Sequence, residues 1–371
     1  MGKWNLWSIV LLAGCVSQSD RNEVLPETVE GPEQTVLAES VMLPAQSLRI
    51  GLYHAPSISG DYASYPELNR FVDHMVERHG FSREFLNGLF SQARRKQWTL
   101  DYLRRSDEAV KTGPVRGGWA RYLAKFLDKR HIKTGTAFWR KHQNALQRAQ
   151  EHYGVPPEYI LGILAVETTF GSYVGSHRVL DALTTLAFDY PRRAEYFRNE
   201  LENFLLMAVK EGFDPAEPVG SFAGAMGLGQ FMPSSFLNWA VDFNGDGERN
   251  LWNPEDAIGS IANYFSQHGW QADEPVVTPA YVATANPDEL ESGITTRYSL
   301  ASLISAGIRP ALDCDCDHPL HLLRLRHYKN DEYWLGHPNF YVITRYNRSS
   351  YYAMAVHELA QAIKKDYKTR N

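Results

Sequence analysis

The sequence lacks a surplus of positive charge. Its 371 residues include 38 Lys and Arg against 43 Asp and Glu, which gives a net charge of −5, and the basic residues form no long run. Nucleic-acid-binding domains usually carry a basic patch, so the composition argues against that class of function. The apolar fraction of 44% is that of a globular protein with a sizeable core.

Long hydrophobic runs are also missing. The apolar stretch from Leu6 to Leu12 is too short to span a bilayer as a stable helix. It ends in Leu12-Ala13-Gly14-Cys15, which resembles the lipobox of bacterial lipoproteins. The resemblance implies that residues 1–15 are a signal segment, cut before Cys15, and that Cys15 carries two or more acyl chains as a stable anchor. Val16 rather than Asp follows the cysteine, which favours the outer membrane. A plain secretory signal with a chance cysteine is the alternative.

Cysteine is scarce. Apart from Cys15, the chain has only Cys314 and Cys316, in the run Asp313 to Asp317. Two cysteines this close strain a mutual disulfide, and the sequence offers no set of His and Cys at zinc-site spacing. We therefore expect a surface loop that carries a thiol pair or a strained bridge. His74 and His79 are five residues apart rather than four, so a His-Glu-x-x-His zinc helix is absent as well.

Helical patterning, by contrast, runs along most of the chain. Residues 16–60 are rich in Glu, Pro, Ser and Gly and are typical of a flexible tether, whereas residues 61–371 form the folded region. Residues 271–345 contain short Val, Thr and Tyr runs that could pair as strands. The predicted fold class is therefore mainly α with a small β part. The expected helices begin near Tyr65 and near Phe85 and also cover residues 134–152, 157–171, 191–210, 233–240, 254–268 and 350–365.

Glu167 is the most informative single residue. A helix that starts at Pro156 and Pro157 carries an apolar stripe, and Glu167 continues that stripe where the pattern would place a leucine. Burying a charged carboxylate is costly, so such a group tends to keep its proton. A carboxylic acid that is protonated near neutral pH is what protonation of a glycosidic oxygen requires. A buried Glu that pairs with an Arg is the structural alternative.

The segment Gly220–Pro233 is rich in glycine and alanine, and small residues let a ligand or a helix approach the backbone closely. Ser221 and Gln230 bring hydrogen-bonding groups into this otherwise apolar stretch. The segment is not a phosphate loop, because no Lys-Ser/Thr follows the glycines. Its Gly-Ser-x-x-Gly order also differs from that of a nucleophile elbow. A tight helix-packing loop is the alternative interpretation.

The segment Asp242–Glu248 fits the opening of a calcium loop, with oxygen ligands at positions 1, 3 and 5 and a glycine at position 6. Position 12 is Asn253 rather than Glu, but Asp256 could close the site from the start of the next helix. An Asx-rich turn without metal is the alternative. The candidate ligands are Asp242, Asn244, Asp246, Glu248 through its backbone carbonyl, and Asp256.

Taken together, these segments resemble the membrane-bound lytic murein transglycosylase B family of the lysozyme-like superfamily. The resemblance runs from about Tyr65 to the C-terminus, and several long motifs in the same order are more specific than any one motif alone. The run around Cys314 and Cys316 is not part of the family pattern. The matching segments are Gly162–Gly171, Tyr190–Phe197, Gly220–Pro233, the loop at Asp242, Asn263–Phe265 and Thr344–Asn347.

The resemblance implies a lysozyme-like core with attached α and β parts. It implies a lytic transglycosylase that cleaves the β-1,4 bond between N-acetylmuramic acid and N-acetylglucosamine in peptidoglycan and leaves 1,6-anhydromuramic ends. The implied partners are the glycan strands and, through the lipid anchor, the periplasmic face of the outer membrane; no organic cofactor and no nucleic acid are expected. The single catalytic acid and base of the family falls on Glu167, and the last carboxylate of its structural calcium loop falls on Asp256. The glycan-binding residues fall on Ser221, Gln230, Tyr264, Tyr346 and Tyr122.

Two other functions remain open at this point. A muramidase that hydrolyses the same bond with water would need a second carboxylate opposite Glu167, and Asp181, Asp189 and Glu195 are the candidates nearby in sequence. A non-catalytic, calcium-stabilised lipoprotein that binds peptidoglycan is the alternative from another class. An acid on an apolar stripe argues against it, because binding alone does not need one.

The lipobox generates a prediction about location. Cys15→Ser removes the acceptor of the acyl chains, so the variant should leave the membrane fraction and appear in the soluble fraction. Fractionation followed by a high-salt wash of the membrane pellet measures this. Retention of the variant in the washed pellet would show that the anchor lies elsewhere.

Overall fold

The computed structural model describes residues 53–110, 116–283, 290–314 and 316–369, so Cys15 and most of the expected tether lie outside the described residues. The chain divides into two compact units. Unit 1 comprises Glu108–Tyr173 and Trp239–Asn371, and unit 2 comprises Val174–Asn238 together with the described residues up to Asp107. In the part of the chain that the structure describes, no helix has both the length and the apolar character to cross a membrane.

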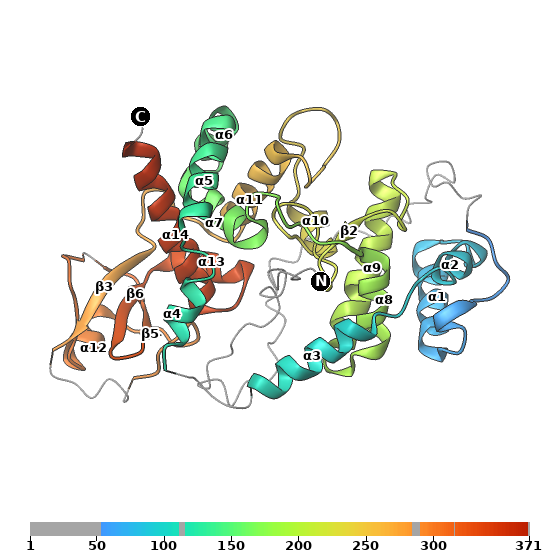
Figure 1. Cartoon of the computed structure of the whole chain (residues 1–371), viewed down its shortest axis with the longest axis horizontal. Helices are drawn as coiled ribbons and strands as arrows, with labels where there is room; N and C mark the ends of the chain where they lie inside the picture. Colours follow the sequence, from blue (N-terminus) through green and yellow to red (C-terminus); the bar gives the residue numbers. More distant parts are fainter. Residues whose placement is uncertain (1–52, 111–115, 284–289, 315, 370–371) are drawn as a thin grey trace, which may run out of the picture. The chain divides into compact units, whose positions relative to one another are not determined.

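Unit 1 is built around α7 (Pro157–Thr168), a helix whose residues are all buried. A helix that is covered on every side belongs in a core. The long helix α14 (Ser350–Thr369) packs against α7 (Figure 1). The contact is close at Gly162, where a Cβ atom would lie 2.8 Å from the backbone oxygen of Val356. The other helices of unit 1 are α4 (Gly118–Leu123), α5 (Lys129–Lys141), α6 (Gln143–Tyr153), α11 (Pro254–Gln267), α12 (Leu300–Ser305) and α13 (Pro338–Tyr346).

Unit 1 also contains an antiparallel four-stranded sheet with the strand order β4-β3-β6-β5. One face of the sheet covers a small apolar cluster of Leu303, Ile308, Leu320, Leu322, Tyr333 and Leu335. This sheet is the predicted β part within residues 271–345. Its strands are β3 (Val277–Val282), β4 (Ile308–Pro310), β5 (His321–Arg326) and β6 (Asp331–Gly336).

Unit 2 is helical apart from a two-stranded ladder of β1 (His177–Arg178) and β2 (Val219–Gly220). Its central pair, α8 and α9, packs side by side (Figure 1). The helices are α1 (Pro66–His79), α2 (Arg83–Phe90), α3 (Gln97–Val110), α8 (Val179–Asp189), α9 (Ala194–Glu211) and α10 (Pro233–Trp239), with 3-10 turns at Gly60–Tyr62 and Pro191–Arg193.

The predicted class, mainly α with a small β part, is confirmed, but two predicted boundaries are wrong. The single helix expected over residues 134–152 is two helices, α5 and α6, because the backbone leaves the helical region at His142 (φ −114°, ψ 26°). The tether ends before residue 60. Tyr53 is buried and donates a hydrogen bond to the Asp214 carboxylate at 2.7 Å, and Ile58 is buried as well. These two anchors are too far apart in sequence to produce a periodic pattern.

The contact between α7 and α14 generates a prediction about stability. Gly162→Ala places a methyl group against the α14 backbone, and overpacking of this kind costs about 1–3 kcal/mol. The melting temperature should therefore fall. Gly118→Ala is the matched control, because its Cβ would meet only the Tyr351 ring at an ordinary 3.5 Å. Equal stability of the two variants would show that α7 and α14 pack less closely than described.

Candidate active site

Glu167 lies one residue before the end of α7, and its side chain is 7% exposed. The Tyr352 hydroxyl, on α14, donates a hydrogen bond to its Oε1 atom at 2.5 Å. The other oxygen, Oε2, is buried and has no hydrogen-bond partner among the described residues. The sequence also allows a buried ion pair between Glu167 and an arginine. The described residues show no such pair. Among them, the one hydrogen-bond partner of this carboxyl group is a neutral hydroxyl group.

Burial determines the protonation of Glu167. Loss of solvent raises the pKa of this carboxyl group from 4.5 to about 8, and the Tyr352 hydrogen bond offsets part of that rise. Desolvation penalises the charged form, whereas a donor to the carboxylate stabilises it. At neutral pH the group therefore carries a proton. With Oε1 held by Tyr352, Oε2 is the atom that can present the proton to a ligand.

The backbone turns sharply just after Glu167. Thr169 and Phe170 both adopt left-handed conformations, with φ of 49° and 57°, which non-glycine residues rarely do. The amide of Phe170 donates to the Leu164 carbonyl and so ends the helix. Such strained conformations persist only where the surrounding structure enforces them, and they are frequent at functional sites.

Tyrosines from other helices of unit 1 surround the acid. Desolvation, followed by the neighbouring charges of Glu167 and Tyr264, raises the pKa of Tyr346 well above its ordinary value. The Tyr264 ring lies edge-on to the Tyr346 ring, with centroids 4.9 Å apart, and its hydroxyl donates to the Arg345 carbonyl at 2.7 Å. Burial raises the pKa of Tyr352, and Glu167, Tyr346 and, to a smaller extent, Tyr122 raise it further. The structure thus brings Tyr346, Tyr264 and Tyr122 into the neighbourhood of Glu167.

Ser221 and Gln230 lie in unit 2, where both support the glycine-rich turn. The Ser221 hydroxyl accepts hydrogen bonds from the amides of Ala223 and Ala225. Gln230 has a left-handed backbone, and its amide nitrogen donates to the carbonyls of Gly227 and Val174. The side chains therefore shape the backbone of this turn.

The carboxylates considered as second catalytic groups lie in unit 2. Asp181 is ion-paired with Arg178 and with Lys96. Asp189 is ion-paired with Arg95 at 3.0 Å, and Glu195 is exposed at the start of α9. Buried Asp181 and partly buried Asp189 are therefore both occupied by structural ion pairs.

The segment Asp242–Glu248 folds into a loop lined with oxygen atoms. The Asp242 carboxylate accepts from the amides of Gly245 and Gly247 at 2.7 and 2.8 Å. The Asn244 side chain donates to Asp246. Asp256 is fully buried in the first turn of α11 and accepts from the amides of Phe243 and Asn250, which closes the loop. Oxygen donors on a tight, glycine-containing turn are the ligands that Ca²⁺ prefers, so these residues fit that ion.

A carboxyl group that is protonated at neutral pH has the property that acid-catalysed cleavage of a glycosidic bond requires. Comparison with known proteins gives the particular class. Residues 63–361 match the family described as Transglycosylase SLT domain. The chain is 46% identical, over 95% of both proteins, to membrane-bound lytic murein transglycosylase B of Escherichia coli.

Solved structures of lytic transglycosylases are similar to this chain as well. The E. coli lytic transglycosylase SLT35 in complex with calcium is 47% identical, with a TM-score of 0.78 over 84% of this chain and 97% of that one. SltB3 of Pseudomonas aeruginosa in complex with NAG-anhNAM-pentapeptide is 27% identical, with a TM-score of 0.68 over 82% and 80% of the two chains. The chain belongs to the transglycosylase SLT domain family and is a lytic transglycosylase with a lysozyme-like fold.

Sequence reasoning missed Tyr352. It occurs in a run of polar residues at the start of a helix, and nothing in that run distinguishes a tyrosine that faces the core from one that faces solvent.

The bond between Tyr352 and Glu167 generates a prediction. Tyr352→Phe removes a donor that lowers the pKa of Glu167, so activity, which needs the protonated acid, should persist to higher pH. Turnover should fall about 10- to 100-fold, because a hydrogen bond to a charged group contributes about 1.5–3 kcal/mol when Glu167 becomes ionised. A pH profile of turnover measures both effects. Tyr367→Phe, on the same helix, is the control. An alkaline limb that stays in place or moves down would contradict the assignment.

Proposed function

We propose that Glu167 is the single acid and base with which this enzyme cleaves the β-1,4 bond between N-acetylmuramic acid and N-acetylglucosamine and leaves a 1,6-anhydromuramic end. The main support for the proposal is the burial and protonation of its carboxyl group. It is buried and protonated at neutral pH, with one oxygen held by Tyr352 and the other without a partner in the part of the chain that the structure describes.

In the first step, Oε2 donates its proton to the glycosidic oxygen as the bond to the muramic C1 breaks. The muramic 2-acetamido group assists at C1, because no side-chain carboxylate takes that role in the proposal. The Tyr352 hydroxyl, already bonded to Oε1, stabilises the carboxylate that forms. Glu167 then accepts the proton of the 6-hydroxyl as that oxygen closes on C1. An intramolecular hydroxyl has a large effective concentration and so competes with water.

Two further observations support a single carboxylate. Asp181 and Asp189 are held in ion pairs, so each has a structural role that accounts for its charge. The P. aeruginosa relative was solved with a fragment that contains anhydromuramic acid. In this proposal Tyr264, Tyr346 and Tyr122 line the glycan path near Glu167, and Ser221 and Gln230 act through the shape of the glycine-rich turn.

We propose further that the loop Asp242–Glu248 binds structural Ca²⁺ with Asp242, Asn244, Asp246, the Glu248 carbonyl and Asp256. The ion would connect the loop to the first turn of α11, because both segments supply ligands. Support comes from the oxygen-only donor set and from the relative that was solved with calcium. The lipid anchor at Cys15 and attachment to the periplasmic face of the outer membrane are likewise proposed, in line with the membrane-bound E. coli relative.

Product analysis tests the proposed chemistry. Digestion of purified sacculi should give muropeptides with anhydro ends, lighter by one water than hydrolysed products, and no label from ¹⁸O-water. Predominantly reducing ends with ¹⁸O would establish a hydrolase with a second carboxylate.

Glu167→Gln tests the residue. The amide cannot donate the proton, so turnover should be abolished. The native chain keeps this proton up to about pH 8, whereas an unfolded Glu loses it near 4.5. Between these pH values the unfolded chain is the ionised one, so the free energy of unfolding falls as pH rises. Gln does not ionise, so the melting temperature of the variant should rise relative to that of the wild type as pH increases from 5 to 8.

Glu158→Gln is the matched control, because Glu158 is buried on the same helix but paired with Lys364 at 2.6 Å. It should lose stability and keep turnover. If Glu167→Gln kept near-normal turnover, or if it lost stability as Glu158→Gln does, the acid assignment would be wrong.

Calcium should raise the melting temperature. A ligand that binds only the folded state stabilises it by about 2.7 kcal/mol at a hundredfold excess over its Kd. Chelator should reverse the gain, and Asp246→Ala, at an exposed position of the loop, should remove the response. Glu274→Gln, outside the loop, should keep it. A melting curve that chelator leaves unchanged would rule out the site.

A further inference from the structure

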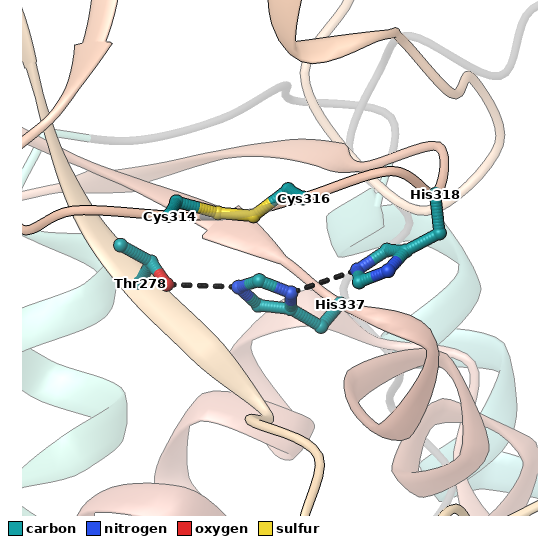
Figure 2. Close-up of a disulfide and its surroundings, with 5 residues drawn as sticks. All are labelled: Thr278, Cys314, Cys316, His318 and His337. Atoms are coloured by element: carbon teal, nitrogen blue, oxygen red, sulfur yellow. Dashed lines mark hydrogen bonds between the residues drawn. A yellow bond between two sulfur atoms is a disulfide. The ribbon is translucent and has the colours of Figure 1, made fainter.

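The cysteine loop of unit 1 lies between β4 and β5, next to two histidines (Figure 2). Cys314 and Cys316 are joined as a disulfide. His318 follows in the same loop, and His337 comes directly after β6, where it is 1% exposed. The local run therefore reads Cys-x-Cys-x-His, and the fold brings in a second histidine from 19 residues further along the chain.

The ligand atoms of these residues lie close together. The sulfur atoms of Cys314 and Cys316 and a ring nitrogen of His337 are all within 4.8 Å of one another. The Nε2 atom of His318 lies 2.9 Å from Nδ1 of His337. Three side chains that can bind a soft metal ion thus lie together, and His318 adjoins them through its contact with His337.

Thr278, on β3, fixes the orientation of His337. Its hydroxyl lies 2.8 Å from Nε2 of the imidazole, which leaves Nδ1 directed toward His318. The His337 amide also donates to the Val276 carbonyl. A hydrogen bond from the second ring nitrogen to a neighbouring group is the usual support of a metal-binding histidine.

Two thiolates and two imidazoles are the ligands of a structural zinc site. Zinc–sulfur bonds of about 2.3 Å and zinc–nitrogen bonds of about 2.0–2.1 Å place neighbouring ligands of a tetrahedral ion roughly 3.3–3.8 Å apart. The 2.9 Å between the two histidine nitrogens is close to these values, and reduction of the disulfide would let the two sulfur atoms move apart to the zinc-ligand separation.

We propose that the dithiol form of this loop binds one Zn²⁺ through Cys314, Cys316, His318 and His337, and that the disulfide and the zinc site are alternative states of the same residues. The disulfide has to be reduced first. A dithiol reductant supplies two electrons and two protons, becomes a disulfide itself and leaves two thiols. Zn²⁺ then displaces the two thiol protons as it binds.

The two states constrain the chain differently. The disulfide joins residues only two apart, so it closes a very small loop. Zinc would instead connect residues 314–318 to His337, the residue that precedes α13. Crosslinks that close longer loops remove more freedom from the unfolded chain. The zinc form should therefore melt at a higher temperature than the reduced, metal-free form.

Metal binding by the full chain tests the proposal. The protein is reduced with dithiothreitol, freed of reductant without air, and equilibrated with Zn²⁺ in excess Ca²⁺, which occupies the loop at Asp242. We expect one more zinc ion per chain in the reduced than in the oxidised protein. We also expect a sulfur-to-metal charge-transfer band when Co²⁺ replaces Zn²⁺.

Variants identify the residues that bind the ion. Cys316→Ser should abolish the charge-transfer band, and Thr278→Val should weaken zinc binding about 10- to 100-fold. His79→Ala is the control, because His74, His79 and Glu202 form the other cluster among the described residues that could hold a metal; it should leave the reduction-dependent ion in place. Equal zinc content in the oxidised and reduced wild-type protein, a comparison that needs no variant to fold, would overturn the proposal. So would loss of the ion in His79→Ala.

Discussion

The burial of one carboxyl group, Glu167, is the constraint on which the rest of unit 1 depends. An ionised carboxylate in this position would lose its hydration with no cation to compensate it. The group therefore keeps its proton, and its pKa rises to about 8. The Tyr352 hydrogen bond tempers that rise and is already in place when the carboxylate forms. In the proposed mechanism, burial keeps the proton on Glu167, and the Tyr352 hydrogen bond stabilises the carboxylate after that proton has left.

The surrounding helices hold this arrangement in place. α7 is covered on all sides, and the absence of a side chain at Gly162 lets α14 approach closely enough for Tyr352 to reach Glu167. Tyr264, on α11, donates a hydrogen bond to the Arg345 carbonyl on α13, and its ring packs against that of Tyr346. The tyrosines come from three different helices, so the position of the acid depends on how those helices pack rather than on any single loop.

Much of this could be predicted from the sequence. A glutamate on an apolar stripe, small residues in a row and alternating oxygen ligands are all local patterns. The first predicted a buried carboxyl group, which Glu167 is; the roles of the other two segments in glycan and calcium binding stay predictions. The partners of these residues could not be predicted, because they come from distant parts of the chain. Tyr352 is 185 residues from Glu167, and His337 is brought to the cysteine loop by the pairing of β5 with β6, in which His321 lies opposite Gly336. The folded residues 53–60 were missed because two isolated anchors make no periodic pattern.

The protonation of Glu167 can be measured directly. Infrared difference spectroscopy of the wild-type protein against Glu167→Gln, recorded as a pH titration, isolates the carboxyl band of this one residue. A protonated carboxyl band that persists through neutral pH and disappears with a midpoint about pH 8 is the expected result. A midpoint near the ordinary value of 4.5 would mean that the group is ionised in the working enzyme, which would contradict its role as the acid.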